Sequence, residues 1–263
     1  MDRQSLRSAA LAAASVAVAL GAWWAAAASG IWSELVFPSP AKVWHAFVYS
    51  LQEHRGRDGY FDAFLWEHVW ASLWRILKGV GWAVLIGVPL GLAIATWRPV
   101  AVIVEPWVNF LRSLPPLAYF VLLIFWFGIG DTSKVWLLFG AAFPPITLAV
   151  IAGVKRVRAD RVDAARMLGA SRLQVLRVTV LPSVLPDLFT GLRISVGFAW
   201  TTIVAAETVN GLPGLGGVAW ATRSQNRADI AVMVVIVIGV VALAMDRLIK
   251  LVEHVAVPWQ GKA

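Results

Sequence analysis

Two ionisable residues in an apolar stretch have the types and the spacing to bind an anion. Glu105 and Arg112 are seven residues apart, so a helix would carry both on one face, two turns from each other. The sequence RSLPP at 112–116 follows, and Pro115 and Pro116 interrupt the hydrogen bonds of a helix. A guanidinium beside freed backbone amides favours negative charge, which predicts an anion site. An arginine that instead binds carbonyl groups freed by the break is an equally open alternative.

A second polar set lies on a single apolar stretch around residue 200. Ionisable groups at membrane depth are costly and mark transport pathways. We expect Arg193 to extend its charged head toward the near membrane surface. We expect Glu207, at the other end of the stretch, to gate a pathway or to pair with Arg223. The candidate pathway residues on the two stretches are Glu105, Arg112, Ser195, Trp200, Thr201, Thr202 and Glu207.

The sequence carries none of the common catalytic motifs. It has no G-x-x-x-x-G-K-[ST] loop for ATP phosphates, no H-E-x-x-H metal motif and no G-x-S-x-G nucleophile turn. Zero cysteines exclude disulfide bonds and thiolate zinc sites. The histidines lack metal-ligand spacing and are predicted to lie at membrane interfaces: His45, His54, His68 and His254. We therefore expect no enzyme activity, no metal and no cofactor, with any ATP bound by another polypeptide.

The composition is that of a membrane protein. Of 263 residues, 59% are hydrophobic and 14% are charged, which is too much apolar side chain for the interior of a soluble domain of this length. Many of the 15 tryptophans fall near the ends of apolar runs, where the headgroup zone accommodates their rings. The net charge of +8 is explained better by anionic lipid and an acidic partner surface than by nucleic acid.

Six apolar stretches are long enough to span a membrane, which takes about 20 residues. The first also resembles a signal peptide with a small-residue cleavage site, but its apolar run exceeds the usual length of about 7–15 residues, which favours a retained span. Residues 30–67 predict an external connection with one interfacial helix after Pro38 and Pro40. The predicted spans cover residues 9–28, 69–97, 100–128 (bent at Pro115 and Pro116), 133–154, 188–209 and 229–251.

The charges predict how these spans are organised and oriented. The chain divides into an N-terminal span with its external connection (1–68), a core (69–252) and a tail (253–263). Within the core, residues 155–187 are rich in Lys and Arg, whereas the 30–67 connection has more acidic than basic residues. The positive-inside rule then places residues 155–187 and both termini in the cytoplasm. Two charges near the outer end of the second span count against this orientation, Arg75 and Lys78.

The basic segment itself predicts two short helices joined by a glycine turn. Asp163 suits the first turn of a helix, and Gly169 would end that helix. Ser171 and Gln174 have the spacing of a capping box for a second helix, which we expect Pro182 to end. Such a segment outside the bilayer fits either an amphipathic helix on anionic lipid or a docking element for a cytoplasmic partner.

The sequence DAARMLGASRLQVLRVTVLP at 163–182 resembles the EAA motif of ABC-transporter permeases: E-A-A, three residues, G, nine residues, I-x-L-P. Asp163 stands in place of the first Glu, and Thr179 in place of the Ile. The resemblance implies that this segment is the coupling region, which inserts into a groove of the ATP-hydrolysing subunit. The matching positions are Asp163, Ala164, Ala165, Gly169, Leu181 and Pro182.

Over roughly residues 65–260 the chain is similar to the taurine, alkanesulfonate and nitrate permease group, in stretches such as LRSLPPLAYFVLLIFWFGIGDTSKVW and TGLRI. The resemblance implies an all-α, six-span permease with the type I importer fold, in the bacterial inner membrane. The partners it implies are a second copy of the chain, two ATP-binding subunits, an external substrate-binding protein and membrane lipid. The implied substrate is taurine, with other alkanesulfonates or nitrate as the alternative.

Further expectations depend on this resemblance. Taurine carries a sulfonate and an ammonium group, which a lining of Arg112, Glu207 and tryptophan would suit. The glycine-rich segment GLPGLGG, 211–217, is expected to form a flexible re-entrant loop or gate beneath a docked binding protein and not a nucleotide site. The rival functions are an ion-coupled transporter or channel and a membrane-embedded enzyme, and for both no ATPase would co-purify with the chain.

Overall fold

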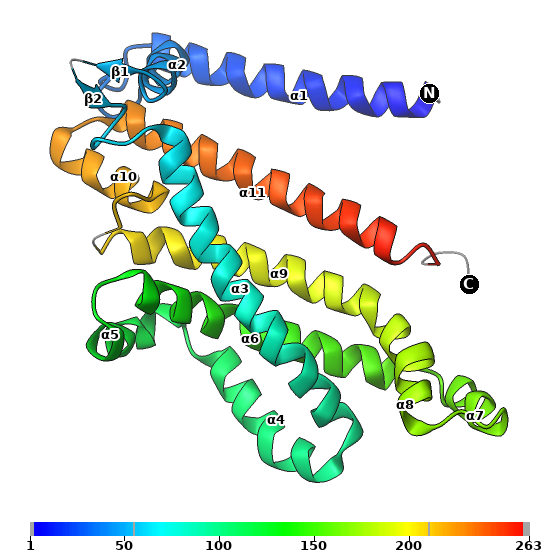
Figure 1. The fold of residues 1–263 in the computed structure, drawn as a ribbon. Coiled ribbons are helices and arrows are strands. Elements are labelled where there is room, and N and C mark those ends of the chain that lie inside the picture. The colour runs from blue at the N-terminus through cyan, green and yellow to red at the C-terminus, as the bar shows by residue number, and fades with distance from the viewer. Residues whose placement is uncertain (1–2, 55, 210, 260–263) are drawn as a thin grey trace.

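The computed structural model describes residues 3–54, 56–209 and 211–259, and these residues form a helical protein (Figure 1). Within them, five helices are long and apolar enough to cross a membrane, and a sixth span is a helix pair bent by 101°. The single helices are α1 (Arg3–Ala28), α3 (Leu65–Thr96), α6 (Asp131–Arg156), α9 (Leu181–Glu207) and α11 (Ala228–Ala256), and the bent pair is α4 (Arg98–Ser113) with α5 (Pro116–Phe127). With the pair counted as one span, the fold matches the predicted six spans.

Short elements gather at the two ends of the long helices (Figure 1). We call these ends the α2 end and the α7 end. The α2 end carries α2 (Pro40–Tyr49), the antiparallel hairpin β1 (Glu53–His54) and β2 (Arg57–Asp58), α10 (Leu215–Ala221) and the 3-10 helix η2 (Thr222–Gln225). The α7 end carries α7 (Ala159–Met167), α8 (Arg172–Gln174) and the π-helix η1 (Val175–Val180). The small hairpin was not predicted from the sequence.

The core lies where α6 packs between α3 and α9. Small residues let these helices approach closely, because a Cβ atom on Gly79 would collide with Leu138 of α6. In the same way, a Cβ atom on Gly191 of α9 would collide with Ala149. Large aliphatic side chains of α6, such as Leu138 and Ile146, are fully buried in this layer. The close packing makes α3, α6 and α9 the scaffold that positions the functional residues.

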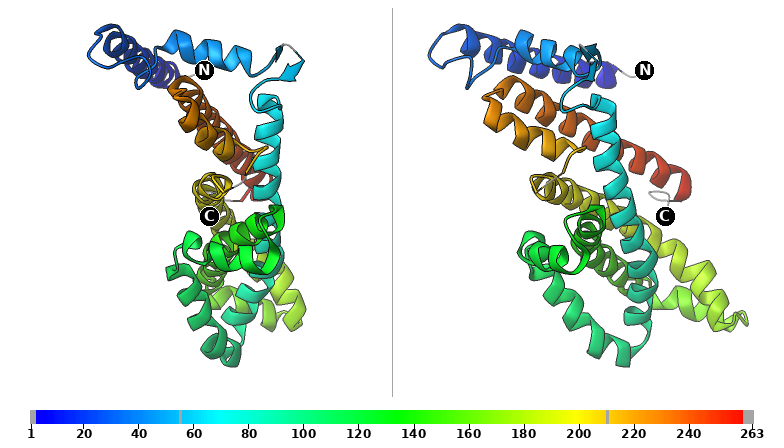
Figure 2. Two further views of the ribbon diagram at one scale, coloured as in Figure 1. Left: turned by 90° about the vertical axis from the view of Figure 1, so that its left-hand side faces the viewer. Right: turned by 60° about the vertical axis from the view of Figure 1, so that its left-hand side comes forward.

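The N-terminal helix α1 lies apart from this scaffold and is joined to it through α2 (Figures 1 and 2). The side chain of Trp23 in α1 donates a hydrogen bond to the carbonyl of Pro38, 3.1 Å away. Helix α2 runs across the ends of the long helices, as the left view of Figure 2 shows. Its residues Val43 and Ala46 are buried, whereas Trp44 is exposed. The helix predicted after Pro38 and Pro40 is therefore present, in an orientation that suits a membrane interface.

The predicted break in the third span is confirmed. Leu114 and Pro115 adopt extended backbone conformations between α4 and α5. Pro116 begins α5, where its missing N–H is one that a helix leaves unpaired in any case. The chain therefore turns sharply between the end of one helix and the start of the next.

Candidate functional site

The predicted coupling segment forms a helix–glycine–helix unit at the α7 end. Gly169 follows α7 with a φ of +85°, a conformation that residues with side chains rarely adopt. The N–H of Ala170 donates to the carbonyl of Ala165 at 3.1 Å, which closes the end of α7. Ser171 Oγ accepts from the N–H of Gln174 at 3.3 Å, and Gln174 Oε1 accepts from the N–H of Ser171 at 2.7 Å. The glycine turn and the capping box are both confirmed.

The expectation that Pro182 ends the second helix is wrong. Helix α8 continues through η1 into α9, so residues 172–207 form one uninterrupted helical run. The N–H of Leu181 donates to the carbonyl of Leu176, five residues earlier, and this wider turn lets Pro182 follow in the first turn of α9. The segment after the glycine turn and the long helix α9 therefore form one continuous helical element.

Helix α7 has an inner and an outer face. Val162 and Ala165 pack inward against a small apolar cluster that includes Val175 of η1. On the outer side Asp163 is exposed, and Met167 keeps 88% of its surface accessible. The next residue, Leu168, is 89% exposed, so the two apolar side chains form a small exposed patch, the kind of surface at which interaction sites occur.

The two anion-site candidates on α4 have different surroundings. Glu105 lies 3.5 Å from Lys155 of α6, in a pair exposed enough to contribute little to stability. Arg112 instead lines a cavity of about 80 Å³ at the break between α4 and α5. The other walls of this cavity include Pro144 of α6 and Phe198 of α9. The structure thus places Arg112, but not Glu105, at the break.

The candidates on α9 do not share one face of the helix. Ser195 is fully buried and donates a hydrogen bond to the carbonyl of Ala142 in α6, 3.1 Å away. Trp200 and Thr202 are also buried. Thr201 is exposed on the other side of the helix. Ser195, Trp200 and Thr202 lie among packed helices of this chain, and the pathway role of the set stays a prediction.

Arg193 does not extend toward the membrane surface as expected. Its Nε atom donates to Asp246 Oδ1 of α11 at 2.7 Å, and both side chains are one third exposed. The carboxylate on the neighbouring helix satisfies the guanidinium at that depth, so no extension is needed. The pair connects α9 to α11.

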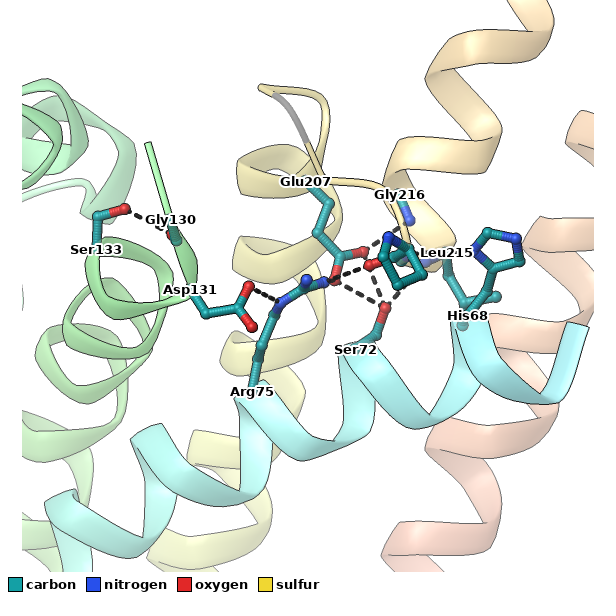
Figure 3. A network of polar contacts seen from close by, with 11 residues as sticks. His68, Ser72, Arg75, Gly130, Asp131, Ser133, Glu207, Leu215 and Gly216 are labelled. Carbon is teal, nitrogen blue, oxygen red and sulfur yellow. Dashed lines mark hydrogen bonds and ion pairs between the residues drawn. The ribbon is translucent and has the colours of Figure 1, made fainter. Parts of the chain in front are cut away.

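Glu207 lies in a buried polar network at the α2 end (Figure 3). Its carboxylate accepts from Arg75 Nη1 at 2.6 Å, from Ser72 Oγ at 2.8 Å and from the N–H of Gly216 at 2.9 Å. Arg75 also donates through Nε to Asp131 Oδ1 at 2.8 Å. The network therefore ties together α3, α6, α9 and the start of α10.

The glycine-rich segment 211–217 is part of this network, contrary to the expectation of a flexible loop. The N–H of Gly214 donates to His68 Nδ1 at 3.1 Å, and the N–H of Leu215 donates to Ser72 Oγ at 2.9 Å. Gly214 must be glycine because a Cβ atom there would collide with the carbonyl oxygen of Gly211 and with the side chains of Glu207 and Arg75. The segment is thus a packed turn whose amides bind side chains of this chain, not an open loop.

Two sequence interpretations at this end need correction. Arg223 does not pair with Glu207, and its guanidinium lies over the ring of Trp220, 5.2 Å from the centroid. His68 is buried and not interfacial, because it holds Gly214. Arg75 is buried beside the carboxylate of Glu207, and the orientation against which Arg75 and Lys78 counted stays a prediction. The sequence feature that could have indicated the Arg75–Glu207 ion pair is the presence of one basic and one acidic residue in two different apolar spans.

A six-span helical bundle with a broken third span and a coupling-type unit before the fifth defines a transporter permease. Residues 87–255 match the family described as "Binding-protein-dependent transport system inner membrane component", and the chain belongs to this family. The fold is that of type I importer permeases. A chain of the MetNI methionine ABC transporter, solved in inward-facing conformations, superposes with a TM-score of 0.59 at 23% identity over 72% of this chain and 95% of that chain.

Relatives of known name narrow the class to ABC importer permease subunits. The taurine transport system permease protein TauC of Escherichia coli (strain K12) is 38% identical over 97% of this chain and 92% of its own. The nitrate import permease protein NrtB of Synechocystis sp. is 30% identical over 91% of this chain and 86% of its own. The bicarbonate transport system permease protein CmpB of Synechococcus elongatus is 33% identical over 75% of this chain and 71% of its own.

Proposed function

We propose that this chain is the membrane-spanning subunit of an ATP-driven importer for taurine. The observation that carries the proposal is the 38% identity to TauC along nearly the whole of both chains. The coupling-type unit, with Asp163 and Met167 exposed beside the glycine turn, supports an energy source in a partner subunit. In this proposal the chain itself is not an enzyme, and ATP is bound by that partner.

The proposed assembly contains two copies of the chain, two ATP-binding subunits and one external substrate-binding protein. The outer face of α7 docks on the ATP-binding subunit. ATP binding brings the two α7 helices together and opens the pathway between the two copies outward, and hydrolysis restores the inward-facing state. The continuous helix from Arg172 to Glu207 carries this movement across the membrane. At its far end Glu207 and Arg75 pass the movement to α3.

The proposed orientation places the α7 end in the cytoplasm and the α2 end outside. The chain then lies in the bacterial inner membrane with both termini in the cytoplasm. The charges of residues 155–187 support this orientation by the positive-inside rule. Residues 260–263 of the predicted cytoplasmic tail lie outside the described residues.

The cavity at the α4–α5 break is the proposed site for the sulfonate group. Arg112 supplies a permanent positive charge with several N–H donors, which suits a sulfonate. The cavity of about 80 Å³ is small, so in this proposal the matching surface of the second copy completes it. We expect Arg112→Gln to raise the KM for taurine at least tenfold, because a hydrogen bond to a charged group contributes about 1.5–3 kcal/mol.

The control for this variant is Arg247→Gln, which removes an exposed arginine of α11 and should leave uptake unchanged. Full transport by Arg112→Gln would exclude Arg112 from substrate binding. It would leave the permease function intact and would favour the alternative in which this arginine only binds backbone carbonyls at the break.

Another alkanesulfonate or nitrate is the second candidate substrate, and the nitrate and bicarbonate relatives support it. The test is uptake of labelled taurine by cells with and without the gene for this chain, competed by unlabelled ethanesulfonate and nitrate. Uptake that disappears with the gene and resists both competitors supports taurine. Strong competition by nitrate or ethanesulfonate moves the substrate to that anion and keeps the importer function.

A further inference from the structure

A cleft of about 860 Å³ lies at the α7 end, between the last turns of α3 and the segment from α7 to η1. Most of its walls are apolar. Leu92 and Ala93 of α3 form one side, and Leu173, Leu176 and Val180 form the other. Six of its lining residues lie within the predicted coupling segment 163–182, but none of them is one of the six motif positions, and none is a candidate pathway residue.

The cleft lies at the level of the membrane surface. It reaches Thr96 and Trp97, at the point where the apolar helix α3 ends after 32 residues. Trp97 is 64% exposed, and a tryptophan in this position prefers the headgroup zone. An occupant of the cleft would therefore have its apolar part among the lipid chains and its other end among the headgroups.

Two arginines line the same cleft. Arg166 comes from α7, and its nearest carboxylate in the described chain, Asp163, is 3.9 Å away at the limit of an ion pair. Arg172 comes from the start of α8 and forms no ion pair with the described residues. A pair of guanidinium groups beside an apolar cleft is complementary to a phosphate joined to hydrocarbon chains.

The cleft adjoins the surface proposed for the ATP-binding subunit, because Arg166 lines the cleft and also lies 3.9 Å from the exposed Asp163. Val162 and Arg166 are four residues apart, so they lie on one face of α7, and both line the cleft. Asp163 and Met167 are exposed and do not line the cleft. An occupant of the cleft could therefore stay bound while a partner covers the outer face of α7.

We infer that this cleft binds one anionic phospholipid, with an acyl chain along the walls formed by α3 and η1 and the phosphate between Arg166 and Arg172. Basic pockets between membrane helices recognise lipid headgroups in this way. The inference that the lipid belongs to the cytoplasmic leaflet rests on the proposed orientation. A bound lipid connects α3 to η1 directly below the coupling unit, so its occupancy affects how firmly α7 is held against the bundle.

The test uses the full chain purified with its ATP-binding partner and reconstituted in nanodiscs. The probe is phosphatidylglycerol with a diazirine on one acyl chain, compared with phosphatidylcholine carrying the same chain. After illumination, labelled peptides are identified by mass spectrometry. We expect phosphatidylglycerol to label peptides 89–97 and 172–180 at least fivefold more than phosphatidylcholine does.

Substitutions distinguish a specific lipid site in the cleft from a general effect of surface charge. We expect labelling by phosphatidylglycerol to fall about fivefold for each of Arg166→Gln and Arg172→Gln. Arg161→Gln with Arg177→Gln removes two exposed arginines of the same segment that do not line the cleft, and should change labelling less than twofold. Ala93→Phe, which narrows the cleft, should lower labelling while both arginines remain.

Several results would overturn the inference. Equal labelling by both lipids would show that the arginines do not select an anionic headgroup. If the Arg161/Arg177 control lost as much labelling as the Arg166 and Arg172 variants, the effect would be one of general surface charge. Labelling that disappears when the ATP-binding partner is present would show that the cleft is part of the subunit interface. Because labelling does not depend on which solute is transported, failure of taurine uptake would leave this test unaffected.

Discussion

The buried ion pair between Arg75 and Glu207 can be tested through its contribution to thermal stability. The side chain of Glu207 is fully buried and that of Arg75 is 6% exposed. Arg75→Met removes the cation of this pair and leaves the carboxylate with hydrogen bonds from Ser72 and the amide of Gly216, beside the buried Lys134. Breaking a buried ion pair by removal of one partner costs about 3–5 kcal/mol, because the other charge stays buried without compensation.

This cost predicts a large change in thermal unfolding. A protein of this size loses about 2–4 °C of Tm for each kcal/mol, so Arg75→Met should lower the Tm by roughly 6–20 °C. The 15 tryptophans allow the transition to be followed by intrinsic fluorescence in detergent. Lys78→Met, one turn further along α3 at an exposed position, is the matched control and should lower the Tm by less than about 2 °C.

A double variant tests the reason for the loss. Arg75→Met with Glu207→Leu removes both charges, and replacing a whole buried pair by apolar residues is often close to neutral. We expect the double variant to regain at least half of the Tm lost by Arg75→Met. If Arg75→Met unfolds at the same temperature as the Lys78→Met control, or if the double variant is no more stable than Arg75→Met, then the charge pair does not hold the α2 end together.

Three further variants test packing and coupling. Gly79→Ala should cost about 1–3 kcal/mol of stability, because its Cβ atom meets Leu138. The control, Gly81→Ala on the open side of the same helix, should cost nothing. Equal Tm values for the two variants would contradict the α3–α6 contact. Gly169→Ala places a side chain at a φ of +85°, which costs about 1–2 kcal/mol of backbone strain. The variant should be expressed normally but should have impaired ATP-dependent uptake. Full uptake would mean that the turn is not needed for coupling. The double variant Met167→Ser with Leu168→Ser should weaken co-purification of the ATP-binding subunit. It should leave the Tm unchanged, because both side chains are almost fully exposed. Unchanged co-purification would place the docking surface elsewhere.

Local features of the fold could be predicted from the sequence because they depend on neighbouring residues. Hydropathy over about 20 residues locates the spans, and Pro115 and Pro116 break the third span wherever it packs. Gly169 and the Ser171–Gln174 box act within a few residues of chain, so both are present where the sequence indicated them. In each case a backbone requirement is visible in the sequence itself.

Features that depend on packing between distant segments could not be predicted. Arg75 and Glu207 are 132 residues apart, and nothing local shows that their helices meet. Ser195 and Thr201 are both polar residues of α9, but only the contact with α6 decides that one is buried and the other exposed. Pro182 was misread because the π-helix before it, which makes room for a proline, has no sequence signal of its own.

The most direct test of the proposed function is transport by the reconstituted complex. The chain, its ATP-binding partner and the external binding protein would be placed in proteoliposomes, and accumulation of labelled taurine would be followed with ATP and with a non-hydrolysable analogue. We predict accumulation above the external concentration with ATP only, and its loss when the binding protein is left out. Taurine that merely equilibrates across the membrane, with or without ATP, would contradict an ATP-driven importer and would favour a channel or an ion-coupled transporter.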